Sequence, residues 1–211
     1  MRKTKEEANL TRCNLLDSAL NVFYEKGVSQ ASLDEVAKTA GVTRGALYWH
    51  FKNKEELFDA LFQIHSLNIE RQMKLILQPN PDHDPLTLLI KGLLEYFNDL
   101  TEDPYLQKFS ALMHPSLGSS ADNDKIIQLV HRYHAYWDEM LIQVLNECKR
   151  LKILNEKLNV ERAWLMIVAT ISGLTIKWLD NPKTFNLLLH AEPILLSCFD
   201  SLKQSPHLLD D

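Results

Sequence analysis

The segment from residue 32 to residue 58, SLDEVAKTAGVTRGALYWHFKNKEELF, constrains the fold of this chain more than any other segment. Ser32, Thr43 and Asn53 are of the residue types that cap helix N-termini, and a glutamate three positions after Ser32 completes a capping box. Gly41 lies where the chain must reverse direction. The spacing predicts two short helices around a tight turn, followed directly by a third helix: 33–40, 44–50 and 54 onward.

The two short helices are expected to cross, with an apolar inner side and a polar outer side. The inner side takes the apolar residues of the segment: Leu33, Val36, Ala37, Val42, Ala46, Leu47 and Phe51. The outer side of the second helix then carries Arg44, Tyr48 and His50. A short helix with such an exposed face, braced by another helix, is typical of helix-turn-helix proteins that bind the major groove of DNA.

Seven residues of this segment are candidates for contacts with DNA. Arg44 is the predicted base reader, because a guanidinium can donate two hydrogen bonds to one guanine. Hydroxyls and free N–H groups at helix N-termini suit phosphate oxygens, and a glycine allows the backbone to approach DNA closely. We therefore expect phosphate contacts from four residues: Ser32, Thr43, Tyr48 and His50. Gly45 is expected to permit the close approach. Lys54, at the start of the third helix, is expected to act as a phosphate clamp. The alternative is that these residues only decorate a solvated helix.

The same residues resemble the signature of TetR-family transcriptional repressors, T-x-x-x-I/V-A-x-x-A-G-V-T-R-G-A-x-Y-x-H-F-x-x-K-x-x-L. Ser32 stands for the leading threonine, and the pattern continues without a gap to Leu57. The tripeptide Tyr48-Trp49-His50 is most similar to the AcrR branch, which represses multidrug efflux genes. The resemblance covers the first quarter or so of the chain. It implies that the positions of Arg44, Tyr48, His50 and Lys54 contact operator DNA.

The charge balance differs between the two parts of the chain, although the net charge of the whole is −5. Residues 1–55 contain nine Lys and Arg against seven Asp and Glu, whereas residues 56–211 contain fourteen against twenty-one. The basic excess thus lies in the segment with the DNA-binding pattern, as phosphate binding requires. Arg2, Lys3 and Lys5 form either a basic arm for the minor groove or a frayed terminus.

The whole chain is predicted to be all-α, with two domains. Residues 1–54 form a three-helix, homeodomain-like head with the helix-turn-helix, and residues 55–211 form a helical bundle for effector binding and dimerisation. The head includes a first helix at 6–25, and the helix from residue 54 is long enough to join head and bundle. Loop signals delimit five further helices: 86–101, 104–114, 122–151, 158–181 and 184–203. Pro193 is expected to bend the last helix or to mark a boundary.

The last two helices carry more apolar residues than a single interior stripe can accommodate. Together they predict a four-helix interface between two protomers, although one large core within the chain is the alternative. The predicted interface residues are Ile167, Ile171, Leu174, Leu188, Leu195 and Phe199. Because one short recognition helix touches few base pairs, a two-fold dimer on a palindromic operator is the expected assembly.

The middle helices combine aromatic residues with a few polar ones, as small-molecule sites do. The predicted ligand-binding residues are Phe97, Phe109, Met113, Tyr133, His134, Trp137, Trp164 and Trp178. A carboxylate among these aromatics favours lipophilic cations. For each aromatic residue taken singly, packing in the core is the simpler interpretation.

The sequence thus predicts a repressor that binds operator DNA as a homodimer and is released by a hydrophobic or cationic small molecule, with a multidrug efflux gene as its target. No catalytic motif, cofactor motif or metal-ligand pattern stands out, so we do not expect an enzyme. Three isolated cysteines are expected to be buried thiols of a reduced cytoplasm, and no membrane association is expected. The alternatives are a helical ligand-binding protein or enzyme with an incidental helix-turn-helix, and an activator or nucleoid protein without an effector.

Overall fold

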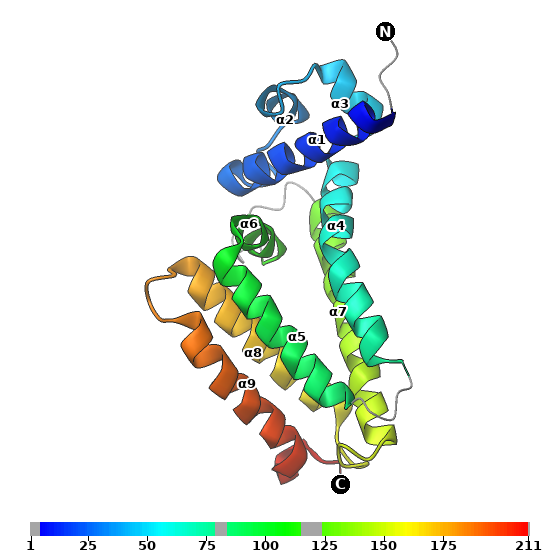
Figure 1. The fold of residues 1–211 in the computed structure, drawn as a ribbon, viewed down its shortest axis with the longest axis vertical. Helices are drawn as coiled ribbons and strands as arrows, with labels where there is room; N and C mark the ends of the chain where they lie inside the picture. The colour runs from blue at the N-terminus through cyan, green and yellow to red at the C-terminus, as the bar shows by residue number, and fades with distance from the viewer. Residues whose placement is uncertain (1–4, 79–83, 115–123, 211) are drawn as a thin grey trace. The chain divides into compact units, whose positions relative to one another are not determined.

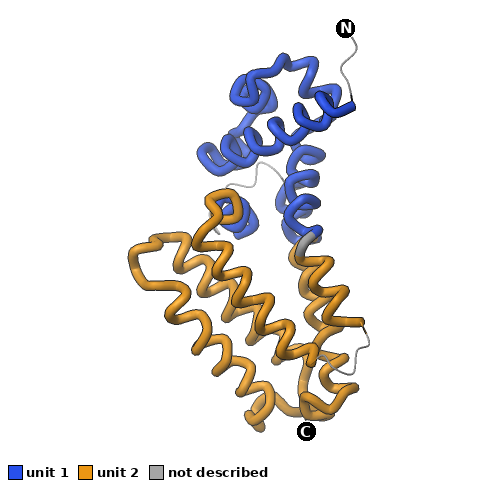
Figure 2. Tube along the Cα trace, viewed as in Figure 1, with its two compact units in different colours: residues 1–67, 108–132 blue, residues 68–107, 133–211 orange. Residues whose placement is uncertain are grey.

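The computed structural model describes residues 5–78, 84–114 and 124–210. Within these residues the chain forms nine α-helices and one short 3-10 helix, which confirms the all-α prediction (Figure 1). The helices divide into two compact units (Figure 2). Unit 1 comprises residues 1–67 and 108–132, and unit 2 comprises residues 68–107 and 133–211.

Unit 1 is built around a three-helix head whose helices meet in one apolar core. The head consists of α1 (Lys5–Lys26), α2 (Leu33–Thr39) and α3 (Arg44–His50). The apolar stripe of α1 packs with side chains of α2, α3 and the start of α4 (Lys54–Ile76), and all of these are almost fully buried: Leu16, Leu20, Phe23, Val36, Leu47, Phe51 and Phe58. Cys13 of α1 is exposed, which corrects the expectation that all three cysteines are buried.

The predicted helix caps of this head are present. Ser32 accepts a hydrogen bond from the backbone N–H of Glu35, and Thr43 accepts one from that of Ala46. The side chain of Asn53 accepts a hydrogen bond from the backbone N–H of Glu56 in the first turn of α4. Gly41 has φ of +65°, in the left-handed region that glycine adopts at little cost, so the turn between α2 and α3 favours this residue.

Unit 2 is a helical bundle with its own core. It holds α5 (Pro85–Glu102), α8 (Val160–Asp180) and α9 (Leu187–Gln204), with parts of α4, α6 (Pro104–Met113) and α7 (Asp124–Arg150). Helix α9 packs against both α5 and α8. The fully buried residues include Phe97, Val144, Leu145, Ile167 and Leu195.

Two helices of unit 2 begin later than the sequence predicted, because asparagine side chains cap them. The side-chain oxygen of Asn159 accepts a hydrogen bond from the N–H of Arg162 at the start of α8, and that of Asn186 accepts one from the N–H of Leu189 at the start of α9. Pro193 lies inside α9, and the helix continues past it to Gln204. Of the two expectations for this proline, a bend or a helix boundary, the boundary is therefore wrong.

The two units do not coincide with the expected division after residue 54. The first part of α4 packs with the end of α6 in unit 1, where the Phe109 ring stacks on the His65 ring at 4.0 Å and lies 6.4 Å from the Phe62 ring. Arg132 of α7 forms an ion pair of 3.0 Å with Asp59 of α4. These contacts join residues far apart in the sequence, so the helical spacing alone did not indicate them.

The end of the chain is tied to the connection between α7 and α8. The N–H of Asn159 donates to the carbonyl of Leu208 at 2.8 Å, and the N–H of Asp210 donates to the carbonyl of Lys157 at 2.8 Å. The guanidinium of Arg162 adds a bond of 2.8 Å to the carbonyl of Leu209. The only β-type pairing within the described residues is the isolated bridge formed here.

Helix α8 is long and apolar enough to cross a membrane when it is judged by length and composition alone, a test that core helices also pass. Only 22% of its most apolar window is buried within this chain. The helix therefore has apolar surface that its own unit does not cover.

Candidate nucleic-acid interface

Helix α3 is held to the head by one side and leaves its other side open. Leu47 is its one buried residue, and Arg44, Tyr48 and Trp49 are exposed. An added Cβ at Gly45 would meet only the Thr43 Oγ1 atom, at 4.0 Å. The fold itself therefore has room for a side chain at this position.

Arg44 and its neighbours form a small cluster of exposed polar groups. The Arg44 Nε lies 3.1 Å from the Asp34 Oδ1, and the guanidinium carbon lies 5.3 Å from the centre of the Tyr48 ring. The Tyr48 hydroxyl accepts a hydrogen bond from Nη2 at 3.4 Å. This hydroxyl, and then the Asp34 carboxylate, raise the pKa of Arg44, so the guanidinium stays charged. The structure thus brings together two of the predicted DNA-contact residues, Arg44 and Tyr48, and adds Asp34 to their cluster.

Trp49 is an exposed aromatic residue that the sequence interpretation did not assign to the site. Its exposed fraction is 73%, and its ring packs edge to face against the ring of His50 at 4.5 Å. Tryptophan side chains are mostly buried in folded proteins, so an indole this exposed on the same helix as Arg44 indicates a surface that binds another molecule. The signal was present in the sequence, because Trp49 stands between two residues already assigned to the site.

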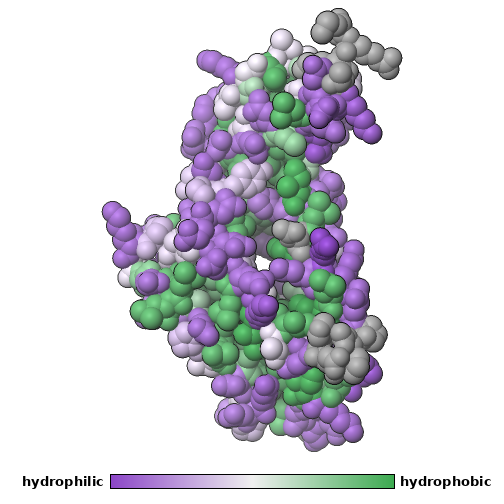
Figure 3. Space-filling model, viewed as in Figure 1, coloured by the Kyte–Doolittle hydropathy of each residue, from purple (hydrophilic) through white to green (hydrophobic). Residues whose placement is uncertain are grey.

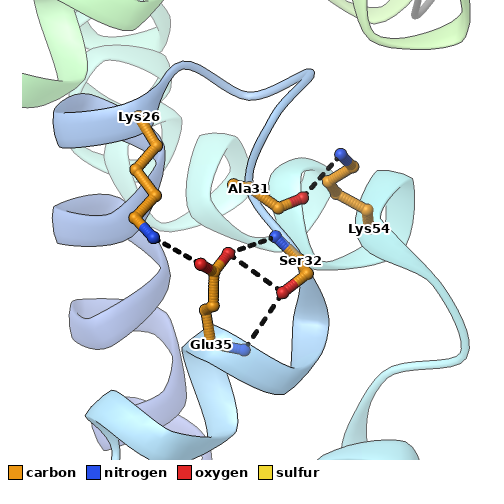
Figure 4. A network of polar contacts seen from close by, with 5 residues as sticks. All are labelled: Lys26, Ala31, Ser32, Glu35 and Lys54. Atoms are coloured by element: carbon orange, nitrogen blue, oxygen red, sulfur yellow. Dashed lines mark hydrogen bonds and ion pairs between the residues drawn. The ribbon is translucent and has the colours of Figure 1, made fainter.

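Ser32 and Glu35 form a reciprocal network at the start of α2 (Figure 4). The Ser32 N–H and hydroxyl donate to the Glu35 carboxylate at 3.0 and 2.9 Å, while the Ser32 oxygen accepts from the Glu35 N–H. Lys26 of α1 forms an ion pair with the same carboxylate. Hydrogen bonds from Lys26, and then from Ser32, lower the pKa of Glu35 to about 2. Ser32 is thus already engaged in a cap, although its side chain is exposed.

Lowering the pH is expected to weaken the head through Glu35. Because the pKa of this carboxyl falls from 4.5 to about 2 on folding, its contribution to stability is complete above pH 4.5 and is lost as the pH falls towards 2. Urea denaturation at several pH values should show this loss in the parent and a smaller one in Glu35→Gln, whose amide does not titrate. Glu25→Gln, at an exposed position of α1, is the control and should keep the parental pH dependence. A parental dependence in Glu35→Gln would contradict this assignment.

Lys54 differs from the expected phosphate clamp. Its ammonium donates three hydrogen bonds to backbone carbonyls of the α1–α2 connection, at 2.6 Å to Val28, 2.9 Å to Ser29 and 2.8 Å to Ala31. Figure 4 shows the last of these bonds. An ammonium has three donors, and all three are used within the protein. The structure therefore corrects the sequence interpretation, because Lys54 ties the start of α4 to the loop that precedes α2.

Replacing Lys54 with methionine is expected to lower the stability of the head by about 2 kcal/mol, because carbonyls that accepted from a charged donor lose it. Methionine keeps most of the apolar stem. The slope of log affinity for DNA against log salt should stay parental, whereas loss of a phosphate contact changes it by about 0.9 per contact. Lys52→Met, at an exposed neighbouring position, should leave the melting temperature unchanged. If Lys54→Met keeps the parental melting temperature and its DNA affinity depends less steeply on salt, Lys54 is a phosphate clamp after all.

The predicted dimer residues do not share one surface. Ile167, Leu195 and Phe199 are at most 1% exposed and belong to the core of unit 2, so they cannot contact a partner directly. The structure corrects this part of the prediction. Ile171 and Leu174 are half-buried against the same core, and only Leu188 is exposed.

A second apolar face on α8 and α9 was missed. On α8 it comprises Leu165, Ala169, Gly173 and Ile176, which are all exposed and recur every three or four residues. On α9, Leu189 and Leu196 are exposed apolar residues seven positions apart, so they share one side of the helix, whereas exposed Leu188 and Ile194 lie on other sides. We call the four α8 residues together with Leu189 and Leu196 the α8–α9 apolar face. Figure 3 shows apolar side chains reaching the surface over the helices of unit 2.

The predicted ligand residues divide between the two units. Phe109 and Met113 belong to unit 1, and the other six belong to unit 2. Phe97, Tyr133 and Trp178 are buried, whereas Trp137, Trp164 and His134 are half-buried. Trp178 also lines a groove of about 440 Å³ on unit 2, together with Thr101 and Glu102 of α5 and with Lys183 and Phe185 of the α8–α9 connection.

Polar contacts link the aromatic residues of unit 2 across helices. The indole N–H of Trp164 on α8 donates to the Asp138 carboxylate on α7 at 2.8 Å, and the rings of Tyr136 and Trp137 lie 5.3 Å apart. The hydroxyls of Tyr96 on α5 and Thr175 on α8 lie 3.3 Å apart. Unit 2 thus places the Asp138 carboxylate in contact with the indole of Trp164.

Comparison with known proteins accounts for both parts of the chain. The family described as "Bacterial regulatory proteins, tetR family" matches residues 15–61, which include α2 and α3. The description "MAATS-type transcriptional repressor, C-terminal region" matches residues 84–204.

Relatives match over nearly the whole length. The chain is 34% identical to the HTH-type transcriptional regulator TtgR of Pseudomonas putida, covering 99% of each chain. It is 36% identical to the HTH-type transcriptional regulator AcrR of Shigella flexneri, covering 88% of this chain and 86% of that protein. The resemblance to the AcrR branch is therefore confirmed.

A solved structure shares the fold. SmeT in complex with triclosan superposes with a TM-score of 0.83 at 26% identity and covers 93% of each chain. SmeT is described as the repressor of the Stenotrophomonas maltophilia multidrug efflux pump SmeDEF. The present chain therefore belongs to the TetR family of bacterial regulatory proteins, and its C-terminal region is that of a MAATS-type transcriptional repressor.

Proposed function

We propose that the protein represses a multidrug efflux gene in the bacterial cytoplasm by binding a palindromic operator as a homodimer. The observation that carries this proposal is the outer face of α3, where Arg44, Tyr48 and Trp49 are exposed on a capped helix fixed by Leu47. Exposed arginine and aromatic side chains on one short helix have the chemistry that base edges and phosphates accept. The family membership supports DNA as the partner.

In this proposal Arg44 reads a base pair and its neighbours hold the backbone of the duplex. Thr43, Tyr48, His50 and Ser32 contribute phosphate contacts, with Trp49 as a further contact. Gly45 supports a close approach, because the fold leaves the space beside it open and its backbone is not in the left-handed region that requires glycine. DNA is the partner that would fill this space.

Two protomers join through the α8–α9 apolar face. Its four positions on α8 include an alanine and a glycine, which allow two helices to approach closely. An added Cβ at Gly173 would meet nothing within 4 Å in the single chain, so a partner helix has room there. Covering exposed apolar residues on two adjacent helices is the driving force for association.

The effector site lies in unit 2 beside Trp164 and Asp138, and its ligand is a hydrophobic or cationic small molecule. The indole fixes the carboxylate by a hydrogen bond of 2.8 Å, and half-buried Trp137 lies one residue away in the sequence. A carboxylate among aromatic rings attracts an organic cation, while the rings accept neutral apolar molecules. Triclosan in SmeT is a ligand of the second kind.

Release from DNA follows from the difference in effector affinity between two arrangements of the dimer. In the DNA-binding arrangement the two α3 helices lie about one turn of DNA apart, roughly 34–36 Å. The effector favours another arrangement, in which both helices cannot enter the groove together. Helix α4 supports this route because it is continuous and contributes residues to both units.

The test uses the full-length protein and a random-sequence duplex library. Repeated selection at low salt should enrich a palindrome, and sedimentation should show an even number of protomers on it. Triclosan and tetraphenylphosphonium should quench tryptophan fluorescence and weaken binding to the selected duplex. Trp164→Phe should reduce this response without changing affinity for DNA in the absence of ligand. If selection enriches no sequence over the input library, the proposal is wrong.

A further inference from the structure

An acidic residue stands beside the proposed base reader. Asp34 lies in the first turn of α2, and its carboxylate forms an ion pair of 3.1 Å with the Nε of Arg44 on α3. The turn between the two helices holds them in register, because the N–H of Val42 donates to the carbonyl of Ala37 at 3.0 Å. The pair therefore joins two helices whose relative placement the fold has already determined.

This pair contributes little to folding. The side chains of Arg44 and Asp34 are 66% and 57% exposed, and exposed ion pairs of this kind add little net stability. A carboxylate near a DNA-binding surface also repels phosphates and so weakens binding to every sequence. Neither folding stability nor attraction to phosphates therefore gives Asp34 a role in DNA binding. The position in which Asp34 holds the guanidinium of Arg44 does give it one.

The contacts of the guanidinium select one of its edges. Arginine can present two neighbouring N–H groups to guanine either from the side, through Nε and one Nη, or from the end, through both Nη atoms. Asp34 occupies Nε, and the ring of Tyr48 lies 5.3 Å from the guanidinium carbon. The hydroxyl of Tyr48 accepts from Nη2 at 3.4 Å, a long bond that a guanine acceptor can replace. The end edge is thus the one left for DNA.

We propose that Asp34 is a positioning residue that determines specificity, because it holds Arg44 so that the end edge of the guanidinium meets the base pair. This inference rests on the proposed function, since it takes Arg44 to be the base reader. Fixing the side chain before binding removes an ordering cost that DNA binding would otherwise bear. Removing Asp34 should therefore reduce discrimination at one base pair by about threefold to tenfold for each half-site.

The experiment measures a ratio rather than an affinity. The full-length protein is titrated with the selected palindrome and with duplexes that change one base pair, and Arg44→Ala identifies the base pair at which discrimination is lost. Asp34→Ala should lower the affinity ratio at that base pair and leave the ratios at other positions unchanged. Asp17→Ala removes a carboxylate from an exposed position of α1 and should leave every ratio unchanged. Each variant also removes one negative charge, and this effect raises the affinity for every duplex alike and cancels in the ratio.

Two further variants separate positioning from a general effect. Asp34→Asn keeps an oxygen that can accept from Nε, so it should retain more of the ratio than Asp34→Ala. In the Arg44→Ala background, Asp34→Ala should cause no further loss at that base pair. Circular dichroism and the melting temperature confirm that each variant is folded.

The outcomes distinguish this inference from the proposed function. If Asp34→Ala keeps the parental ratio while Arg44→Ala loses it, Asp34 is not a positioning residue and Arg44 remains the base reader. If Arg44→Ala keeps discrimination at every base pair, both statements are wrong.

Discussion

Replacing Leu165 with glutamate is expected to convert the dimer into a monomer and to lower operator affinity by about a thousandfold, towards non-specific binding. Leu165 is 57% exposed in the single chain and lies in the α8–α9 apolar face. In a symmetric interface the substitution places two carboxylates without partners where apolar side chains would meet, and burying an unpaired charge is strongly unfavourable. One α3 helix alone touches too few base pairs to hold the operator.

The measurements are sedimentation equilibrium and titration of a labelled operator duplex. Leu151→Glu is the matched control, because Leu151 is also exposed, at 42%, but follows α7 and lies outside the α8–α9 apolar face. This control should remain dimeric and bind DNA as the parent does. A dimeric Leu165→Glu protein with parental affinity would place the interface elsewhere. Because Leu165 is exposed in the single chain, the monomer is expected to keep its helical circular dichroism.

Replacing Arg44 with alanine is expected to remove sequence discrimination while leaving weak, salt-dependent binding. A good bidentate contact between arginine and guanine contributes about 1–3 kcal/mol of discrimination, and a dimer makes it twice. The substitution leaves the fold intact, because Arg44 is exposed and the one buried residue of α3 is Leu47. Phosphate contacts from the rest of the head remain and bind any duplex.

The informative quantity is the ratio of affinities for the operator and for a scrambled duplex at one salt concentration. This ratio should fall in Arg44→Ala. Lys38→Ala is the control, since Lys38 is an exposed basic residue at the end of α2 and its removal should weaken both affinities alike or not at all. A parental ratio in Arg44→Ala would remove Arg44 from the role of base reader.

The head could be predicted closely because its signals are local. Ser32, Thr43 and Asn53 cap helices by contacts with residues three positions away, and Gly41 marks the turn through its own backbone conformation. Such signals depend on neighbours in the sequence, so the spacing of residue types suffices to detect them. The exposed positions of α3 followed from the same spacing.

The role of Lys54 could not be predicted in this way. Its partners lie 23 to 26 residues earlier in the sequence, and the ammonium meets their carbonyls only after the head has folded. The pairing of Asp34 with Arg44 depends likewise on the turn that brings α2 against α3. A charged residue near a DNA-binding motif indicates phosphate contacts by its type, and its real partner is visible only in three dimensions.

The sequence by itself determined the helical class, the head, the exposed face of α3 and the presence of excess apolar residues on α8 and α9. Only the tertiary structure decided which of those apolar residues face inward. Ile167 and Leu165 are both apolar and two positions apart on one helix, yet the first is buried in the core and the second is exposed. The reason is that periodicity reports how apolar residues are spaced around a helix, whereas the packing of α5, α8 and α9 determines which side of the helix the core covers.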